Sequence, residues 1–412
     1  MALLVQKFGG TSVADLDHIR RVARRVAAAR DRGDRVVVVL SAMAGETNRL
    51  VDLAEGAAAD PIRREYDVVV STGEQVTIGL LAIILNDMGC PAQSFLGSQV
   101  PVRTDSVHGA ARIEGIETTA LVETLDGGGV AVVAGFQGVD ADGSITTLGR
   151  GGSDTTAVAL AAALGADLCE IYTDVEGVYT TDPGICPDAR KLKKISYDEM
   201  LEMASLGARV LQTRSVEFAR KYSMPVMVRS SFTDADGTLV AMEDSDMEQV
   251  VVSGVTYNKN EAKISVIRVP DRPGIAVRLF RPLTEAGINV DMIVQNISHD
   301  GFTDMTFTVQ TSDYARALGL VKDVAPELGA GEVMGNTDIA KVSIVGAGMK
   351  SHAGIASKMF EVMAREGINI QMISTSEIKV SVVVDAKYTE LAVRVLHKAF
   401  GLGSDEVSEE TD

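Results

Sequence analysis

Two segments in the second half of the chain repeat each other, and this repeat constrains the fold more than any other feature of the sequence. Residues 274–293 match residues 354–373 without a gap at an offset of 80, with GIA, GIN and a Met-Ile pair recurring in register. The preceding runs EAKISVIRV and IAKVSIVGA match at an offset of 78. Such a repeat predicts two copies of one folding unit. We expect each copy to contain a strand, a loop, a helix and two further strands.

The first half of the chain has a different periodicity. β-rich runs such as ALLVQKF, RVVVVLSAM, AQSFLG, GVAVVAGFQG, LCEIYTD and MPVMVRS alternate with helical patterns near 71–88, 112–126, 153–165 and 197–222. This alternation predicts an open α/β domain with a mainly parallel sheet and helices on both faces. The apolar runs VVVVL and VAVVAG are typical of strands buried on both faces.

These patterns divide the chain into five parts. We expect the α/β domain over residues 1–230, an acidic linker over 231–249, repeat units over 250–335 and 336–405, and an acidic tail over 406–412. Residues 250–262 are a candidate for pairing with the second repeat unit and not with the first.

Composition argues against several classes of protein. The 412 residues carry a formal charge of −18, whereas nucleic-acid-binding surfaces need a basic stripe to displace counterions. Three cysteines without a C-x-x-C pair argue against a disulfide framework or a cysteine zinc site. The apolar run at the start of the chain is too short for a signal peptide, and we find no run of about 18 uncharged apolar residues that could span a membrane. We therefore expect a cytoplasmic protein that binds neither nucleic acid nor membranes.

The stretch TLGRGGSDTTAVALAAAL, residues 147–164, places three glycines and an arginine before an alanine-rich helix. Such a turn offers backbone N–H groups and the positive end of the helix dipole, which favour an anion such as phosphate. The spacing matches neither a P-loop nor a complete G-x-G-x-x-G. Taken alone, the stretch is explained equally well by a tight turn with Ser153 or Asp154 capping the helix.

Other predicted strands are also followed by polar residues. Lys7 lies beside a second glycine turn in KFGGTS, and Asp174 follows the strand predicted at 168–173. Ordinary explanations exist for each residue alone: Ser71 and Glu74 have the spacing of a capping box, and Asp174 suits a turn. Ligands of open α/β sheets gather at the carboxyl ends of strands, however. A lysine, an arginine, two glycine turns and several acids at one edge together predict a site for phosphoryl transfer.

Seven motifs resemble those of one enzyme family, the aspartate kinases. They are KFGGTS at 7, VVLSAMAGETN at 38, STGEQV at 71, VAGFQGVD at 133, TTLGRGGSDTTAVALAAAL at 146, YTDVEGVYTTDP at 172 and EMLEMASLGARVLQ at 199. The repeat units resemble ACT regulatory modules, and the resemblance extends to about residue 402. The chain is similar to the monofunctional type, since about ten residues remain for any fused homoserine dehydrogenase domain.

The resemblance implies an amino-acid-kinase fold followed by two ferredoxin-like ACT domains. It also implies transfer of the γ-phosphate of ATP, with Mg²⁺, to the side-chain carboxylate of L-aspartate, the first step towards lysine, threonine and methionine. An aspartate carboxylate is already ionised at neutral pH, so no general base has to activate it. Repulsion between the two anions is instead relieved by positive charge and oriented N–H groups.

The resemblance further implies roles for individual residues. The catalytic residues are Lys7, Asp154 and Arg209. The residues that bind aspartate are Ser41, Thr47, Glu74, Asp126, Arg150 and Ser153. The nucleotide site is formed by Lys7, Phe8, Gly9, Gly10, Thr173, Asp174, Tyr179, Asp182, Arg209 and Val210. No site built by the protein for a metal is expected, because Mg²⁺ usually arrives with the phosphates.

Two positions depart from the family pattern. Gly184 stands where arginine usually follows Asp-Pro, and Arg209 stands where lysine usually precedes Val-Leu. Gly184 removes a phosphate contact, and Arg209 keeps the charge in a different shape. We expect weaker ATP affinity with intact chemistry, so a Gly184→Arg variant should have a lower KM for ATP.

The ACT units imply feedback inhibition by lysine, threonine or both. The effector would bind where the first unit of one chain meets the second unit of another. One side of this site is formed by Asp271, Gly274, Ala276, Asn289, Asp291 and Gln295, and the other by Ile355, Ala356, Asn369, Ile370 and Ser376. We expect a homodimer through the ACT units, or an α2β2 assembly if Met247 is an internal start.

Three alternatives stay open. Another carboxylate kinase of the same fold, such as an acetylglutamate kinase, would share most of the glycine turns. A dinucleotide-dependent oxidoreductase is suggested by KVSIVGAGMKS at 341, although Ser351 replaces the third glycine of the motif. A non-catalytic amino-acid sensor is suggested by Gly184.

Overall fold

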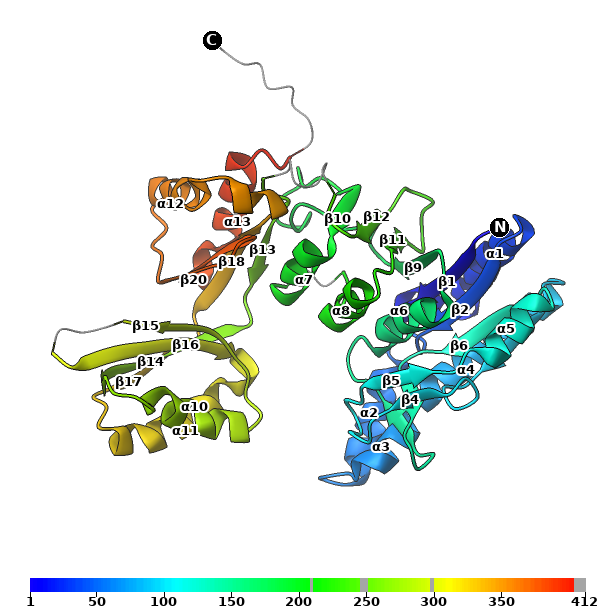
Figure 1. The fold of residues 1–412 in the computed structure, drawn as a ribbon, viewed down its shortest axis with the longest axis horizontal. Coiled ribbons are helices and arrows are strands. Elements are labelled where there is room, and N and C mark those ends of the chain that lie inside the picture. The colour runs from blue at the N-terminus through cyan, green and yellow to red at the C-terminus, as the bar shows by residue number, and fades with distance from the viewer. Residues whose placement is uncertain (208–209, 245–250, 297–299, 404–412) are drawn as a thin grey trace, which may run out of the picture. The chain divides into compact units, whose positions relative to one another are not determined.

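The computed structural model describes residues 1–207, 210–244, 251–296 and 300–403, coloured by residue number in Figure 1. These residues form two compact units. The first contains residues 1–179, 191–205 and 210–244, and the second contains 180–190, 206–207 and 251–403. The segment 180–190 therefore groups with the C-terminal half, although it falls inside the range 1–230 predicted for the first domain.

An eight-stranded sheet in the order β10-β12-β11-β9-β1-β2-β6-β3 runs through the first unit. Every neighbouring pair is parallel except β11 and β12. The prediction of an α/β fold with a mainly parallel sheet is therefore confirmed. The strands are β1 (Leu3–Phe8), β2 (Arg35–Leu40), β3 (Ala92–Phe95), β6 (Val130–Ala134), β9 (Leu168–Thr173), β10 (Lys194–Ser196), β11 (Val226–Ser230) and β12 (Thr238–Ala241).

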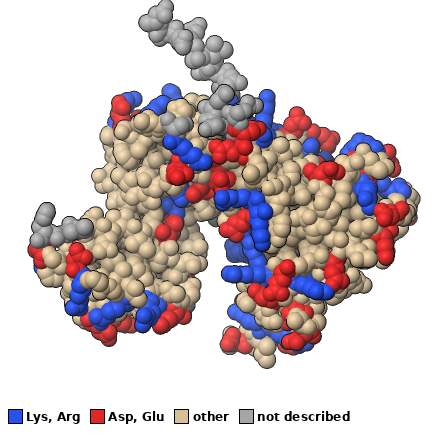
Figure 2. Space-filling model, viewed as in Figure 1, with Lys and Arg blue, Asp and Glu red and all other residues tan. Residues whose placement is uncertain are grey.

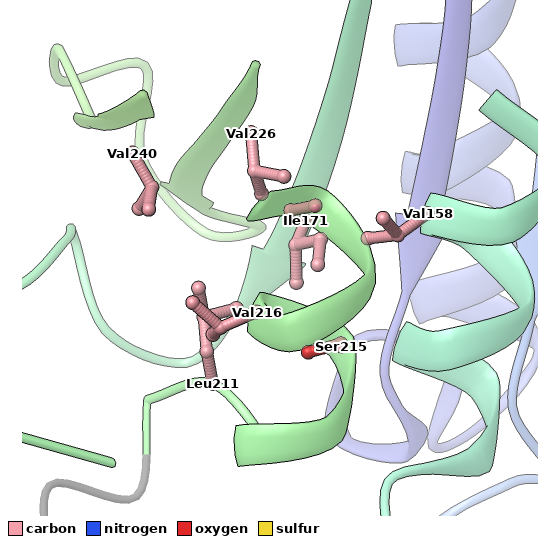
Figure 3. Close-up of a pocket in the computed structure, with 8 residues that line it drawn as sticks. Val158, Ile171, Leu211, Ser215, Val216, Val226 and Val240 are labelled. Carbon is pink, nitrogen blue, oxygen red and sulfur yellow. The ribbon is translucent and has the colours of Figure 1, made fainter. Parts of the chain in front are cut away.

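Helices cover both faces of this sheet (Figure 1). On one face, α1 (Leu16–Asp31) and α4 (Thr72–Asp87) bury apolar side chains against β1, β2 and β6. On the other face, Val158 of α6 (Gly152–Leu164) and Val216 of α8 (Thr213–Lys221) pack with Ile171 of β9, as Figure 3 shows. Successive strand residues point to opposite faces, so β9 contributes Ile171 to one core and Tyr172 to the other.

The helical run over residues 63–87 is long and apolar enough to cross a membrane, judged by length and composition alone. It consists of α3 (Arg63–Val70) and α4, and half of its most apolar window is buried inside the protein. Ile78, Leu81 and Leu85 of α4 pack in the core against the sheet. We therefore interpret α4 as a core helix, because its apolar side chains already have partners.

Two helical predictions were wrong in extent. Residues 112–126 contain a strand, β5 (Ile113–Ile116), before the short helix α5 (Thr119–Asp126). β5 belongs to a four-stranded sheet in the order β5-β4-β7-β8, with β4 (Val102–Thr104), β7 (Gln137–Val139) and β8 (Ile145–Thr147). Residues 197–222 form two helices, α7 (Tyr197–Ser205) and α8. The structure also contains α2 (Glu46–Ala57), for which we had made no prediction.

The first repeat unit is ferredoxin-like, as predicted. Its elements are β14 (Glu261–Pro270), α10 (Ile275–Glu285), β15 (Val290–Gln295), β16 (Phe302–Gln310), α11 (Tyr314–Leu328) and β17 (Val333–Asn336). The sheet order is β15-β16-β14-β17, and both helices bury their apolar sides against it. The second helix and the fourth strand are additional to the pattern expected from the repeat.

The second repeat unit takes its fourth strand from upstream of the first. Its own elements are β18 (Ile339–Val345), α12 (Ile355–Arg365), β19 (Met372–Thr375), β20 (Lys379–Asp385) and α13 (Thr389–Ala399). β13 (Gly254–Asn258) pairs antiparallel with β18 and completes the sheet order β13-β18-β20-β19. Residues 254–258 therefore pair with the second repeat unit, as considered for 250–262, whereas Glu261 and Ala262 pair with β16 of the first repeat unit.

A buried ion pair joins the two repeat units. Lys341 Nζ of β18 lies 2.8 Å from Glu261 Oε1 of β14, and both side chains are about 95% buried. Asp291 of β15 also contacts the Lys341 ammonium group. Beside them, Met292 of β15 and Met372 of β19 belong to a small apolar cluster. The units are thus held together by charge as well as by apolar contact.

Candidate active site

Lys7 and Asp154 form the centre of the site. Lys7 lies near the carboxyl end of β1, and its Nζ is 2.5 Å from Asp154 Oδ1 in the first turn of α6. Both residues are less than 10% exposed. The carboxylate fixes the position of the ammonium group in a place from which most water is excluded.

Glycines allow the backbone to approach this pair closely. A Cβ added to Gly9 would lie 3.4 Å from Lys7 Nζ, and one added to Gly10 would lie 3.0 Å from the carbonyl oxygen of Ala42. At the end of β6, a Cβ on Gly135 would collide with the side chain of Ser153 at 2.7 Å. A larger residue at Gly10 or Gly135 would therefore force neighbouring atoms of the site to move, whereas the contact at Gly9 is an ordinary van der Waals distance.

The N-terminus of α6 has no side-chain cap. Gly151 is the N-cap residue in the left-handed conformation, with φ of 70°, and Ser153 and Asp154 lie inside the helix. The prediction that Ser153 or Asp154 caps the helix was therefore wrong: Asp154 is engaged by Lys7, and Ser153 packs against Gly135. The N-terminus of α6 thus has no side-chain cap, and an uncapped helix N-terminus is a type of site that favours an anion.

Glu74 has an unusual carboxyl group. The residue is 2% exposed and lies in the first turn of α4, and its Oε1 accepts a hydrogen bond of 3.1 Å from the Ala42 N–H. Among the described residues, its Oε2 has no hydrogen-bond partner. Burial raises the pKa of Glu74 to about 7. An uncompensated buried carboxyl oxygen is costly, so this atom is a candidate for binding a cationic ligand.

The capping-box explanation of Glu74 does not hold. No side chain caps α4 at Ser71, whose hydroxyl instead donates a hydrogen bond of 3.1 Å to the Val68 carbonyl. The Glu74 carboxyl reaches across to the loop after β2, where a Cβ on Gly73 would lie 2.7 Å from Ala42 Cβ. The close approach of α4 to this loop thus positions Glu74.

Arg150 lies in the turn before α6 and is exposed. Within the described part of the chain, no carboxylate forms an ion pair with its guanidinium group. A neighbouring arginine that we did not predict, Arg214 of α8, donates a hydrogen bond of 2.6 Å to the Leu148 carbonyl and another to the Ala111 carbonyl. Arg214 therefore positions the turn that presents Arg150.

A second residue that was not predicted, Asp67, also holds the turn before α6 in place. Asp67 of α3 is completely buried and accepts hydrogen bonds from the backbone and the hydroxyl of Thr147, at 3.0 and 2.6 Å. It also accepts one of 3.0 Å from the Gly109 N–H and contacts His108 Nδ1 at 3.0 Å. An aspartate beside the apolar run VVV was the only sequence signal for this network.

Three other residues, Ser41, Thr47 and Asp126, were predicted to bind the substrate. Ser41 follows β2, and its N–H donates to the Phe8 carbonyl at 3.1 Å, while Thr47 lies in the first turn of α2. The position of Asp126 contradicts its predicted role in binding the substrate. It ends α5 and forms an ion pair of 2.6 Å with Arg35, the first residue of β2. Arg35 pairs with Leu3 at the amino ends of the strands, away from Lys7.

The predicted nucleotide residues are only partly brought together. Thr173 ends β9, and its hydroxyl donates to Asp174 Oδ1 at 3.0 Å. The side chain of Phe8 is buried and stacks on Tyr172, with ring centroids 4.6 Å apart, so only its backbone is available to a ligand. Tyr179 is half-buried, and burial raises its pKa.

Of the remaining predicted nucleotide residues, Asp182 and Val210 are described and Arg209 is not. Asp182 belongs to the second unit, where its Oδ2 accepts a hydrogen bond of 2.8 Å from the Tyr257 hydroxyl. Val210 is half-buried before α8. Arg209, Met247 and the predicted tail lie outside the described residues, as does part of the predicted linker.

Ser12 and Ser231 were also missed by sequence reasoning. Their hydroxyl oxygens lie 2.6 Å apart, and the Ser231 hydroxyl donates to the Thr173 carbonyl at 2.8 Å. This network joins the glycine turn after β1 to the end of β9. Single serines in loops give no sequence signal that they meet.

The predicted effector residues occupy matching places in the two repeat units. Gly274 and Gly354 are N-cap residues with φ of 87° and 91°, and Ala276 and Ala356 follow them in the first turns of α10 and α12. The same turn of α12 contains Ile355. The other predicted residues lie after β14 (Asp271), at or beside β15 (Asn289, Asp291 and Gln295) and beside β19 (Asn369, Ile370 and Ser376).

No metal centre is formed by the described side chains: none of them gather as three or more His, Cys, Asp or Glu residues. All three cysteines are buried and free. Figure 2 shows both acidic and basic side chains over the face in view. The site is therefore equipped with a lysine, an arginine, a helix N-terminus and carboxylates, which suits an anionic substrate and its transfer chemistry.

Comparison with protein families assigns the chain in three parts. The amino acid kinase family matches residues 2–230, and the ACT domain matches residues 264–326 and 342–400. Among curated relatives, the aspartokinase of Pseudomonas aeruginosa is 59% identical over 404 residues, 98% of each chain. The aspartokinase of Mycolicibacterium smegmatis is 48% identical over 411 residues, again 98% of each chain.

Solved structures agree with these relatives. Escherichia coli aspartokinase III in complex with aspartate and ADP matches with a TM-score of 0.82 and 29% identity, covering 96% of this chain and 99% of that one. The same enzyme in complex with lysine and aspartate matches with a TM-score of 0.77 and 29% identity, covering 97% and 99%.

Proposed function

Because the chain belongs to the aspartokinase family, we propose that the site around Lys7 transfers the γ-phosphoryl group of ATP to the side-chain carboxylate of L-aspartate. The product would be 4-phospho-L-aspartate. The observation that carries this assignment is Glu74, whose buried Oε2 lacks a partner among the described residues and can accept from the α-ammonium group of an amino acid.

Arg150 would hold the α-carboxylate of the same substrate. Its guanidinium group is exposed and has no ion-pair partner in the described chain, and arginine grips carboxylates through two parallel hydrogen bonds. Glu74 and Arg150 would thus recognise the two charged groups that every α-amino acid carries. Ser41, Thr47 and Ser153 would supply hydroxyl groups beside them.

Lys7 would neutralise the phosphoryl group during transfer. Its ammonium group is fixed by Asp154, so it need not reorganise when negative charge develops. The backbone at Gly9 and Gly10 and the N-terminus of α6 would offer N–H groups to the phosphates. The carboxylate of aspartate attacks the γ-phosphorus atom, the bond to the bridging oxygen breaks, and ADP leaves with that oxygen.

Mg²⁺ would enter with the phosphates of ATP. The described residues form no three-ligand cluster, and this ion is usually held by phosphates, waters and one or two carboxylates. Asp174, which is one of the predicted nucleotide residues and is exposed directly after β9, is a carboxylate available to the ion. When bound, the ion supplies charge neutralisation of the phosphate oxygens.

Hydroxylamine trapping tests the proposed reaction. The full chain is incubated with ATP, Mg²⁺ and either L-aspartate or N-acetylglutamate, and hydroxamate is measured. We expect hydroxamate from L-aspartate only. Hydroxamate from N-acetylglutamate alone would identify a different carboxylate kinase, and none from either would identify a sensor without catalysis.

The oxidoreductase alternative has no structural basis. The run KVSIVGAGMKS forms β18 and a short 3-10 helix, and β18 pairs antiparallel with both neighbours. A dinucleotide-binding turn instead connects a parallel strand to an α-helix. A Cβ on Gly346 would lie 2.3 Å from the Val251 carbonyl, so packing accounts for this glycine.

Lysine, threonine or both would inhibit through the ACT units. The residues predicted for this site lie at matching helix N-termini and edge strands of the two units. The related Escherichia coli enzyme has been solved with lysine and aspartate in a T-state. Inhibition requires that the effector bind two conformations with different affinity. Activity that stays unaltered at saturating lysine plus threonine would exclude this regulation.

A homodimer through the edge strands of the ACT units would complete the effector sites. Ile293 of β15 and Ile373 of β19 occupy matching repeat positions and are 52% and 45% exposed. Exposed apolar edge strands are ready to pair with another chain. Light scattering should show a dimer that Ile293→Asp converts to a monomer, whereas Met334→Asp, on the edge strand β17, should leave it intact. With its substrates, such an enzyme would work in the cytoplasm.

A further inference from the structure

A cavity of about 570 Å³ lies in the first unit, on the face of the sheet covered by α1. It is bounded by α1, by the strands β1, β9 and β11, and by the loop after β11. The lining residues are Gln6, Arg21, Arg24, Arg25, Ala28, Arg32, Glu170, Tyr172, Arg229 and Asp234. Its volume falls in the range of sites for small molecules.

The charge of this cavity is opposite to that of the whole chain. Five arginines and two carboxylates line it, which leaves three positive charges in a protein whose formal charge is −18. Arg229 Nε lies 3.1 Å from Glu170 Oε1, and Arg25 pairs with Asp234 at 2.8 Å. The surplus charge therefore belongs to Arg21 and Arg24 of α1 and to Arg32, which directly follows that helix. Concentrated arginine favours a ligand with phosphate or carboxylate groups.

Among the described residues, these three arginines form no close ion pair: their contacts are with uncharged groups or with a distant carboxylate. Arg24 donates to the carbonyl of Arg20, Arg21 lies over the ring of Phe232, and Arg32 is 3.8 Å from an aspartate. None of these contacts neutralises a guanidinium group as a close bidentate carboxylate would. Arg21 and Arg24 lie about one turn apart on α1, Arg32 follows its last turn, and all three line the cavity.

Gln6 adds a polar atom at the bottom of the cavity. It is 1% exposed, and its Nε2 donates a hydrogen bond of 2.8 Å to Glu170 Oε2. Among the described residues, its Oε1 has no hydrogen-bond partner. This oxygen can only accept, so the ligand that satisfies it must bring a hydroxyl or N–H group.

The cavity is separate from the site around Lys7. Gln6 and Lys7 are consecutive residues of β1 and therefore point to opposite faces of the sheet. Gln6 lines the cavity, whereas Lys7 pairs with Asp154 of α6 on the other face. A ligand in the cavity cannot be the reacting substrate.

We propose that this cavity binds a small phosphate monoester that carries a hydroxyl group. The phosphate would be held by Arg21, Arg24 and Arg32, and the hydroxyl would donate to Gln6 Oε1. Free inorganic phosphate and phosphorylated polyols share the phosphate group, but only the polyols carry alcohol hydroxyl groups that can reach beyond it to Gln6 Oε1.

Calorimetric titration of the full chain distinguishes these ligands. At constant ionic strength, we expect saturable binding of glycerol 3-phosphate, at least about fivefold tighter than binding of inorganic phosphate. Gln6→Leu should abolish this difference between the two probes. Arg24→Gln should weaken both about tenfold, as expected for a lost charge-assisted hydrogen bond.

Two controls decide whether the cavity is responsible. Arg20 lies on the same helix, pairs with Asp17 and does not line the cavity, so Arg20→Gln should leave the affinity within about twofold. Lys7→Ala should also retain binding, since Lys7 faces the other side. Equal losses in Arg24→Gln and Arg20→Gln, loss of binding in Lys7→Ala, or no saturable binding by the wild-type protein would each overturn the proposal.

Discussion

Lys7 and Asp154 come from different elements, yet their charged atoms lie 2.5 Å apart in a nearly buried position. β1 supplies the cation, and the first turn of α6 supplies the anion. The pair is thus built where a parallel strand and a helix N-terminus meet. Neither partner can be removed without leaving an isolated buried charge.

Lys7→Ala should lower kcat about 100- to 1000-fold, because a preorganised charge on the transferring group is lost. The KM for L-aspartate should change by less than about threefold, since Lys7 is assigned to the phosphoryl group. Steady-state kinetics in both substrates measures this. Asp154→Asn added to Lys7→Ala should cost far less than in the wild-type background, because the two residues act as one unit. Fully additive losses would contradict the coupling.

Glu74 predicts a pH dependence of aspartate binding. Its pKa is raised to about 7 by burial, and only the ionised form attracts an ammonium group. The kcat/KM for L-aspartate should therefore rise as the pH increases through about 7. Glu74→Gln should raise the KM at least about tenfold and flatten this pH profile. A variant that keeps the wild-type profile would assign the ionisation to another group.

The same carboxyl group affects stability in the opposite direction. Its folded pKa of about 7 is above the ordinary value of 4.5, so the folded protein holds a proton that the unfolded chain has released between these pH values. The free energy of unfolding should fall as the pH rises through this window, by about 3 kcal/mol at most. Glu74→Gln should remove this part of the slope in denaturant unfolding measured from pH 4.5 to 7.

Arg150→Ala should raise the KM for L-aspartate about 10- to 100-fold with little effect on stability, because the side chain is exposed and unpaired within the described structure. Arg150→Lys should recover only part of the affinity, since an ammonium group cannot grip a carboxylate with two parallel hydrogen bonds. Arg103→Ala, at an exposed arginine paired with Glu117, provides a control that should leave the KM unchanged.

Lys341→Met should lower the free energy of unfolding of the C-terminal compact unit by about 3 to 5 kcal/mol, because it leaves Glu261 buried without its countercharge. Denaturant unfolding of the full chain measures this loss. The double variant Lys341→Met/Glu261→Met should recover most of it. Lys259→Met breaks an exposed pair with Glu390 and should cost less than about 1 kcal/mol. Similar losses for both lysines would show that burial does not decide the cost.

The fold was largely predictable because its signals are local. Apolar runs such as those of β2 and β6 mark buried parallel strands, and the repeat marks the ACT units. Prediction failed where short segments depend on tertiary contacts. β5 is four residues long and exists through its pairing with β4, which periodicity over 112–126 cannot reveal.

The candidate site was predictable only in part, for a related reason. Lys7, Glu74 and Asp154 lie in long motifs, whereas Arg214, Asp67 and Ser231 act through contacts with distant backbone atoms. The role predicted for Asp126 was wrong because a charged residue at the end of a helix can lie at either edge of a sheet, and the sequence does not show at which. The arginine cavity involves several separate elements, so no single stretch of sequence announces it.

The pairing of β13 with β18 has a consequence for how the C-terminal half is made. The two repeat units follow one another in the sequence, but the entire first repeat unit lies between β13 and β18, which are neighbours in one sheet. During synthesis β13 emerges about 80 residues before its partner strand β18, with the first repeat unit between them. The first repeat unit is therefore inserted within the second. A fragment that starts after the first repeat unit lacks the edge strand β13 of the second, whereas the first repeat unit contains all four strands of its own sheet.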